Sequence, residues 1–101
     1  MCRAAAIIGA ALGLTWCGIA TAAGLADAPP GALSCSGCHP PVATAGTPVP
    51  PLAGGDANAI VAAMQSFRSG QRSATVMDRI AKGFTDDEIR AIAAWYAAQK
   101  Q

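Results

Sequence analysis

Hydrophobic residues recur at helical spacing in two stretches of the second half of the chain. In the first, Ile60, Met64 and Phe67 lie three or four residues apart, which predicts an amphipathic helix with these side chains on its buried face. Asp56 is a suitable N-cap just before this stretch, and Gly70 is a suitable stop signal just after it. The pattern therefore predicts a helix that occupies the interval between Asp56 and Gly70.

The second stretch lies close to the C-terminus. It opens with Thr85-Asp86-Asp87-Glu88, a capping box in which the threonine oxygen accepts from the glutamate N–H and the glutamate side chain reaches back. The three acidic residues also suit the positive end of a helix dipole. We expect this helix to run to about Gln99. Its buried face comprises Ile89, Ile92, Ala93 and Tyr96.

The other elements of the pattern are short. Residues 31–38 and 76–82 each read as a brief helical turn, ended by Pro40-Pro41 and by Gly83 respectively. Residues 40–55 lie between the first of these turns and the helix that begins after Asp56, and they form a loop rich in Pro, Gly, Ala and Thr. A loop of this length is unusual unless it has something to pack against. No stretch alternates as a strand does. The sequence therefore predicts an all-α fold with a thin core of its own.

The N-terminal stretch differs from the rest in composition. Arg3 is followed by the small and apolar residues 4–20, and Ala20-Thr21-Ala22 has the small-x-small form of a cleavage site. These features predict a secretory signal peptide over residues 1–23, cleaved to leave one domain over residues 24–101 in the periplasm, without a membrane span. An uncleaved membrane anchor is the alternative.

Charge and size narrow the class of protein. One of the seven Lys and Arg residues lies in the predicted signal peptide, so the remainder balance the six Asp and Glu residues. This balance argues against a nucleic-acid binder, which would show a basic excess. A domain of this length buries little surface and usually depends on a disulfide, a metal or a cofactor.

The run Cys35-Ser36-Gly37-Cys38-His39 identifies that cofactor. A Cys-x-x-Cys-His sequence is the attachment motif of c-type haem, in which the two thiols bond the two porphyrin vinyl groups and the histidine is the proximal iron ligand. A thioredoxin-like dithiol would need strands, which the pattern lacks. A zinc site would need a second Cys/His pair, and His39 is the only histidine. We predict one covalent haem c held by Cys35, Cys38 and His39.

Two methionines outside the predicted signal peptide are possible sixth ligands, because small electron carriers often use a methionine thioether. Met64 lies on the apolar stripe of a predicted helix, where a flexible core-filling role suits it. Met77 follows a polar loop and is well separated in sequence from His39, so it is free to approach the opposite haem face. We predict Met77 as the iron ligand.

The region from residue 24 onward resembles single-haem class I cytochromes c. Pro50-Pro51-Leu52-Ala53-Gly54 is similar to the family's Pro-x-Leu-x-Gly segment. The resemblance implies that the Pro50 carbonyl accepts the ring N–H of His39, and that Leu52 packs on the porphyrin. A proline-rich loop without a haem role is the alternative. The fold implied is the small all-α class I cytochrome c fold.

A closer resemblance covers residues 67–72 and 74–89, which include Met77. These segments are similar to the cytochrome subunit of flavocytochrome c sulfide dehydrogenase. The resemblance implies an electron-transfer subunit, not itself an enzyme, that accepts electrons from an FAD-containing partner and passes them to another cytochrome c or a membrane acceptor. Some members carry two haems, whereas this chain has one motif. A freely diffusing periplasmic shuttle and a haem sensor or enzyme are the alternatives.

Overall fold

The structure, a computed structural model, describes residue 24 and residues 27–100. The predicted signal peptide, residues 1–23, lies outside these described residues. Within them the chain forms helices and no strand, and no helix combines the length and the hydrophobicity that a membrane span requires. The helices are α1 (Ala32–Cys35), α2 (Ala57–Ser69), α3 (Met77–Ala81) and α4 (Asp86–Ala97). The all-α prediction is therefore confirmed.

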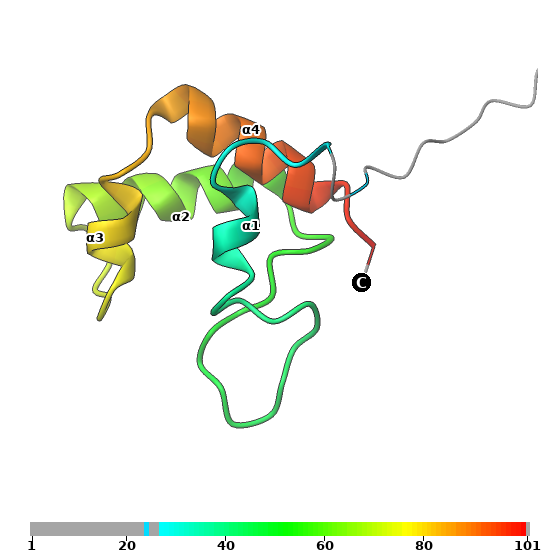
Figure 1. Ribbon diagram of the computed structural model, residues 1–101. Coiled ribbons are helices and arrows are strands. Elements are labelled where there is room, and N and C mark those ends of the chain that lie inside the picture. The colour runs from blue at the N-terminus through cyan, green and yellow to red at the C-terminus, as the bar shows by residue number, and fades with distance from the viewer. Residues whose placement is uncertain (1–23, 25–26, 101) are drawn as a thin grey trace, which may run out of the picture.

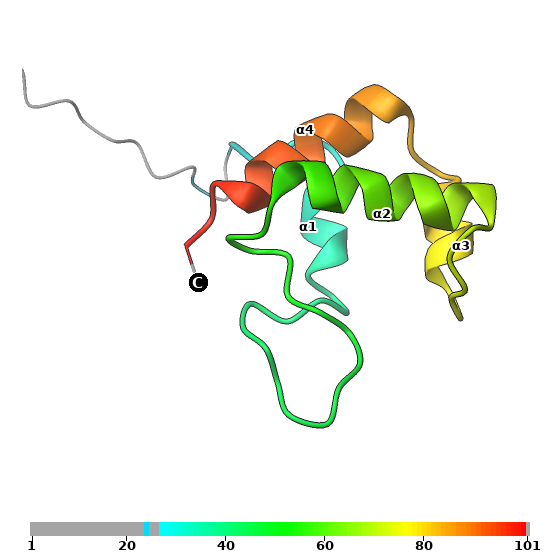
Figure 2. The same cartoon turned by 180° about the vertical axis from the view of Figure 1, so that it is seen from behind.

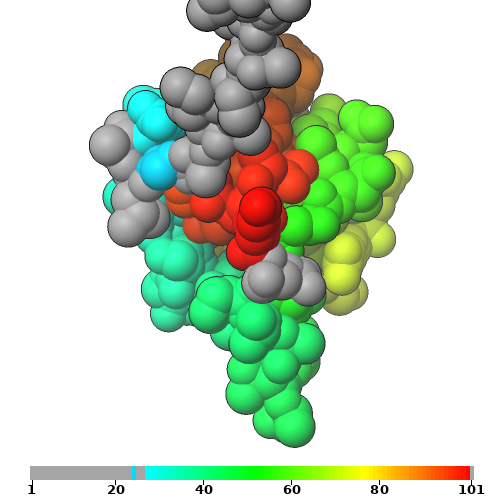
Figure 3. Space-filling view, turned by 90° about the vertical axis from the view of Figure 1, so that its right-hand side faces the viewer, coloured from blue at the N-terminus to red at the C-terminus, as the bar shows by residue number. Residues whose placement is uncertain are grey.

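The two long helices lie side by side, with α1 beside α4 and α3 against the C-terminal end of α2 (Figures 1 and 2). A long loop over residues 40–51 projects from this body (Figure 3) and returns toward the start of α2 (Figure 1). This loop contains no helix, as the proline-rich sequence predicted. The helices thus gather on one side of the molecule, and the loop from α1 to α2 extends on the other.

Local sequence signals set the ends of α2. The Asp56 side chain accepts a hydrogen bond from the Ala59 N–H at 2.8 Å, which satisfies one of the free amides of the first turn. At the other end Gly70 adopts φ 80°, a left-handed conformation that costs glycine little, and its N–H bonds the Phe67 carbonyl. The prediction of a helix between Asp56 and Gly70 is confirmed.

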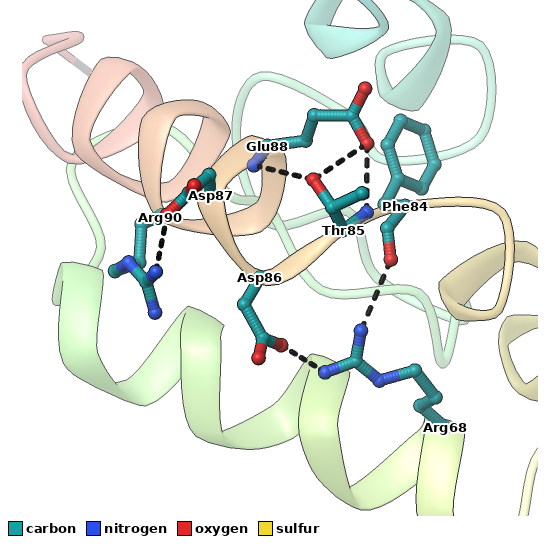
Figure 4. A network of polar contacts seen from close by, with 7 residues as sticks. All are labelled: Arg68, Phe84, Thr85, Asp86, Asp87, Glu88 and Arg90. Carbon is teal, nitrogen blue, oxygen red and sulfur yellow. Dashed lines mark hydrogen bonds and ion pairs between the residues drawn. The ribbon is translucent and has the colours of Figure 1, made fainter.

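The capping box at the start of α4 is also confirmed. The Thr85 hydroxyl oxygen accepts from the Glu88 N–H at 3.3 Å, and the Glu88 carboxylate accepts from the Thr85 N–H at 2.7 Å (Figure 4). The helix ends at Ala97, slightly earlier than expected. The reason is that the Gln99 N–H bonds the Tyr96 carbonyl three residues back, which tightens the last turn.

A small core lies where α1 meets α4. It consists of Ala32, Ile92 and Tyr96, and the Tyr96 hydroxyl donates to the Ala32 carbonyl oxygen at 2.6 Å. Gly31 begins α1 with φ 84°, and a Cβ at this position would lie 2.5 Å from Phe84 Cε1. Only glycine satisfies both the backbone angle and this close approach.

One expectation about α2 needs correction. No residue of α2 is buried, and its apolar stripe of Ile60, Met64 and Phe67 is half-buried. All three side chains line a cavity, and Ile60 also packs against the core between α1 and α4. At the end of α2, Arg68 donates to the Phe84 carbonyl at 3.1 Å and pairs with Asp86 (Figure 4). This side chain links the end of α2 to the start of α4.

Candidate cofactor site

A cavity of about 890 Å³ opens between α1, the loop that follows it, α2 and α3. Its size is at the upper end of the range of about 300–1,000 Å³ that is usual for ligand and cofactor sites. Apolar side chains make up most of its wall. They include Val49, Ile60, Ala63, Phe67, Val76, Ile80, Phe84, Ile89 and Ile92.

All six residues predicted to hold the haem line this single cavity. Cys35 is the last residue of α1, and Cys38 and His39 follow it. Pro50, Leu52 and Met77 come from two segments further along the chain. The fold therefore brings together residues that are far apart in the sequence, on a surface made mainly of apolar side chains.

A tight turn after α1 presents the two thiols. The Cys38 N–H and the His39 N–H both bond the Cys35 carbonyl, at 3.2 and 2.9 Å. Both thiols are free, with Cys35 half-buried and Cys38 exposed. Burial raises the pKa of the Cys35 thiol. The pair is thus available for bonding to a group in the cavity.

The imidazole of His39 is held by the loop that follows it. Its Nδ1 lies 2.6 Å from the Pro50 carbonyl oxygen, and since a carbonyl can only accept, Nδ1 carries the proton. This tautomer leaves the lone pair of Nε2 free to bind a metal. The same loop is anchored to α4, because the Gly54 N–H donates to the Tyr96 carbonyl at 3.0 Å.

Both methionines reach the cavity. Met77 is the first residue of α3, and Met64 lies on the stripe of α2 that we expected to pack in a core. Lining the cavity therefore does not by itself choose between them, and the prediction of Met77 rests on the sequence argument. The donor set around this large apolar cavity fits a covalently attached haem. It consists of two free thiols, a histidine with an open nitrogen and a thioether.

Sequence reasoning missed several wall residues. Val76 and Ile80 line the cavity from the α3 region, and Phe84 lines it from the turn before α4. The exposed fractions of Val76 and Ile80 are 52% and 42%, high for large apolar side chains. The helical period of the sequence identified which face of each helix is apolar. It gave no information about which of these faces line the same cavity.

Comparison with known proteins gives one match. Over 64 residues the chain is 39% identical to the cytochrome subunit of sulfide dehydrogenase from Chlorobaculum tepidum. The chain is similar to a cytochrome subunit. The match covers 63% of this chain and 58% of the Chlorobaculum protein, so the chain spans somewhat more than half the length of that relative. No protein-family model matches the chain.

The similarity to the cytochrome subunit confirms the resemblance predicted from the sequence. Together with the helical architecture, it also supports the predicted fold class, a small all-α cytochrome c fold.

Proposed function

We propose that the protein is an exported, periplasmic electron-transfer cytochrome that carries one covalently attached haem c. The observation that carries the proposal is the meeting of Cys35, Cys38, His39 and Met77 on one large apolar cavity. Similarity to a cytochrome subunit supports it independently.

Each residue of the site has a distinct role in this proposal. The thiols of Cys35 and Cys38 would hold the haem through thioether bonds, and His39 Nε2 and the Met77 thioether would bind its iron. Pro50 fixes the orientation of the His39 ring through the 2.6 Å contact, and Leu52, which lines the same cavity, would pack on the porphyrin. The haem, when bound, supplies reversible one-electron chemistry. The apolar wall limits the access of water to the metal and so favours a raised reduction potential.

We further propose that the electron donor is an FAD-containing subunit that oxidises sulfide, and that the acceptor is another cytochrome c or a membrane component. The relative's role as a subunit of sulfide dehydrogenase supports this assignment. A balanced formal charge on residues 24–101 suits a docked subunit, because diffusing shuttles often use a marked charge ring for steering. Sulfide chemistry then belongs to the partner.

The first test is spectroscopic. The full chain is produced in a periplasm that has a c-type maturation system, and haem content is measured by mass and by the alkaline pyridine spectrum, which distinguishes thioether-bound haem. We expect one haem per chain. In the wild type we expect a low-spin methionine-ligated spectrum that Met77→Ala abolishes and Met64→Leu retains. The opposite result would assign the sixth position to Met64.

The second test concerns the partner. Gentle purification from the native periplasm should give a complex that contains both haem and flavin, and sulfide should reduce its haem. A lone haem protein of monomer size that sulfide does not reduce would instead support the freely diffusing shuttle.

A further inference from the structure

The polar side chains of the cavity wall fall into two groups. Ser34 donates to the Gly31 carbonyl, Asp56 caps α2, and His39 bonds Pro50, so these three are engaged within the protein. Apart from the Cys38 thiol, the polar wall side chains within residues 27–100 that make no hydrogen bond to other protein groups come from one turn between α2 and α3. They are those of Arg72, Ser73 and Thr75.

The end of α2 holds Arg72 in this position. Because Gly70 is left-handed, the chain reverses there, and the Arg72 N–H bonds the Ser66 carbonyl at 3.1 Å. The guanidinium carbon of Arg72 then lies 4.8 Å from the centre of the Phe67 ring, a cation–π contact. Both Arg72 and Phe67 line the cavity. The guanidinium group is thus held at the cavity wall by Phe67, and its own N–H groups make no hydrogen bond within the protein.

The other cations of the described chain do not compete for this role. Arg68 is engaged with Phe84 and Asp86, and Arg90 pairs with Asp87 on the exposed side of α4 (Figure 4). Arg79, Lys82 and Lys100 do not line the cavity. Among residues 27–100, Arg72 is the one Lys or Arg residue in the wall.

We propose that Arg72 binds a propionate carboxylate of the haem, assisted by the neighbouring hydroxyls, and so raises the reduction potential. This inference rests on the proposed function. Haem carries two carboxylates, and a planar guanidinium with five donors matches a carboxylate in a bidentate pair. A positive charge near the iron disfavours the oxidised state, which carries one more positive charge than the reduced state.

The test compares the midpoint potentials of purified holoprotein variants. Arg72→Gln should shift the oxidation–reduction equilibrium up to about tenfold toward the oxidised form, which is a fall of about 59 mV for a one-electron couple. Arg90→Gln removes the same charge from the exposed side of α4 and should leave the potential within a fifth of that shift, ~10 mV. The propionate bending mode in the resonance Raman spectrum should change in Arg72→Gln alone. The visible spectrum confirms that the axial ligands are retained.

A charge-conserving variant separates binding from packing. Arg72→Lys keeps the cation but loses the planar group over Phe67, so its potential should stay closer to wild type than that of Arg72→Gln. Equal potentials in wild type, Arg72→Gln and Arg90→Gln would overturn the inference, as would Arg72→Lys behaving like Arg72→Gln. If Arg72→Gln fails to retain haem, the reduction potential and the Raman spectrum of Arg72→Lys, compared with those of wild type, decide whether Arg72 binds the propionate. A wild-type protein without covalent haem would instead overturn the proposed function.

Discussion

The corner where α1 meets α4 and the wall formed by α2 and α3 are built from similar residues in different ways. In the corner, Ala32 is fully buried and Tyr96 has an exposed fraction of only 6%. In the wall, α2 buries no residue, and Val76 and Ile80 remain about half-exposed. The protein's own contacts bury the corner, whereas the apolar side chains that α2 and α3 contribute to the cavity stay partly exposed.

This difference shows how the chain divides its stabilisation. Each well-buried aliphatic or aromatic side chain contributes about 1.5–3 kcal/mol, and of the large side chains the corner collects only Ile92 and Tyr96 among the described residues. Ile89 is the largest side chain that approaches complete burial within the described residues. Such a core is thin, so we expect a bound group in the cavity to supply the contacts that the wall lacks.

The largest expected effect comes from removing that group. Cys35→Ala/Cys38→Ala, produced without haem, should lose more than about half of the helical circular dichroism signal, because the remaining core is too small for a stable domain. Any residual protection from hydrogen exchange should lie in α1 and α4. The control is Ser36→Ala, which changes the same turn but keeps both thiols. Full helicity in the double variant would show that the wall needs no cofactor.

A backbone substitution tests the corner next. Gly31→Ala should destabilise the holoprotein by about 2–4 kcal/mol, since alanine pays for the positive φ and its Cβ would meet Phe84. Gly46→Ala is a matched control, because Gly46 has φ 81° and nothing within 4 Å. It should cost about 1–2 kcal/mol. Denaturant unfolding measures both, and equal losses would mean that the close approach to Phe84 contributes nothing.

A smaller effect is expected at the hydrogen bond from the Tyr96 hydroxyl to the Ala32 carbonyl oxygen. Tyr96→Phe leaves the Ala32 carbonyl without its donor in a buried position, at a cost of about 1–2 kcal/mol. Because Tyr96 does not supply an iron ligand in the proposed site, the reduction potential should hardly change. Urea unfolding checks the expected loss of stability, and redox titration of the same sample checks the unchanged reduction potential. A Tyr96→Phe protein as stable as wild type would contradict the expected role of this hydrogen bond.

The sequence predicted those features of the two regions that depend on residues close to one another in the chain. The Asp56 cap, the Gly70 stop and the capping box of α4 each involve residues within four positions, and all three are present. The contact of Gly31 with Phe84 and the link from Arg68 to α4 join distant segments, which periodicity does not report. They had to come from the three-dimensional structure.

The same limit applies to the candidate site. The Cys-x-x-Cys-His motif is local and was readable, the position of Met77 in the chain pointed to it as the iron ligand, and the family resemblance pointed to Pro50 and Leu52. The apolar period of α2 correctly marked one face but was interpreted as core, because a stripe that faces a cofactor and a stripe that faces another helix have the same spacing. Nothing in the sequence pattern distinguishes Arg72 from the other cations, and only the turn after Gly70 places it on the cavity wall.

The smallest expected effect concerns the ion pair that joins the corner to the wall. The hydrogen bond from Arg68 lowers the pKa of Asp86. A carboxyl whose pKa is lower in the folded state stabilises the fold above its unfolded pKa of about 3.9 and loses this contribution as the pH falls through the folded value. Arg68→Gln should therefore be less stable than wild type at pH 7, and the carboxylate-dependent part of the difference should vanish once the pH falls below the lowered, folded-state pKa of Asp86.

Denaturant unfolding of both proteins between pH 2 and 7 measures this difference. Arg90→Gln is the control, because the ion pair of Arg90 with Asp87 lies within α4 and is exposed. Pairs of that kind contribute about 0–0.5 kcal/mol. Arg68 also donates to the Phe84 carbonyl, a bond that no change of pH removes. A stability gap that persists unchanged at pH 2 would show that Arg68 joins the two regions through Phe84 alone, and that the ion pair with Asp86 adds nothing.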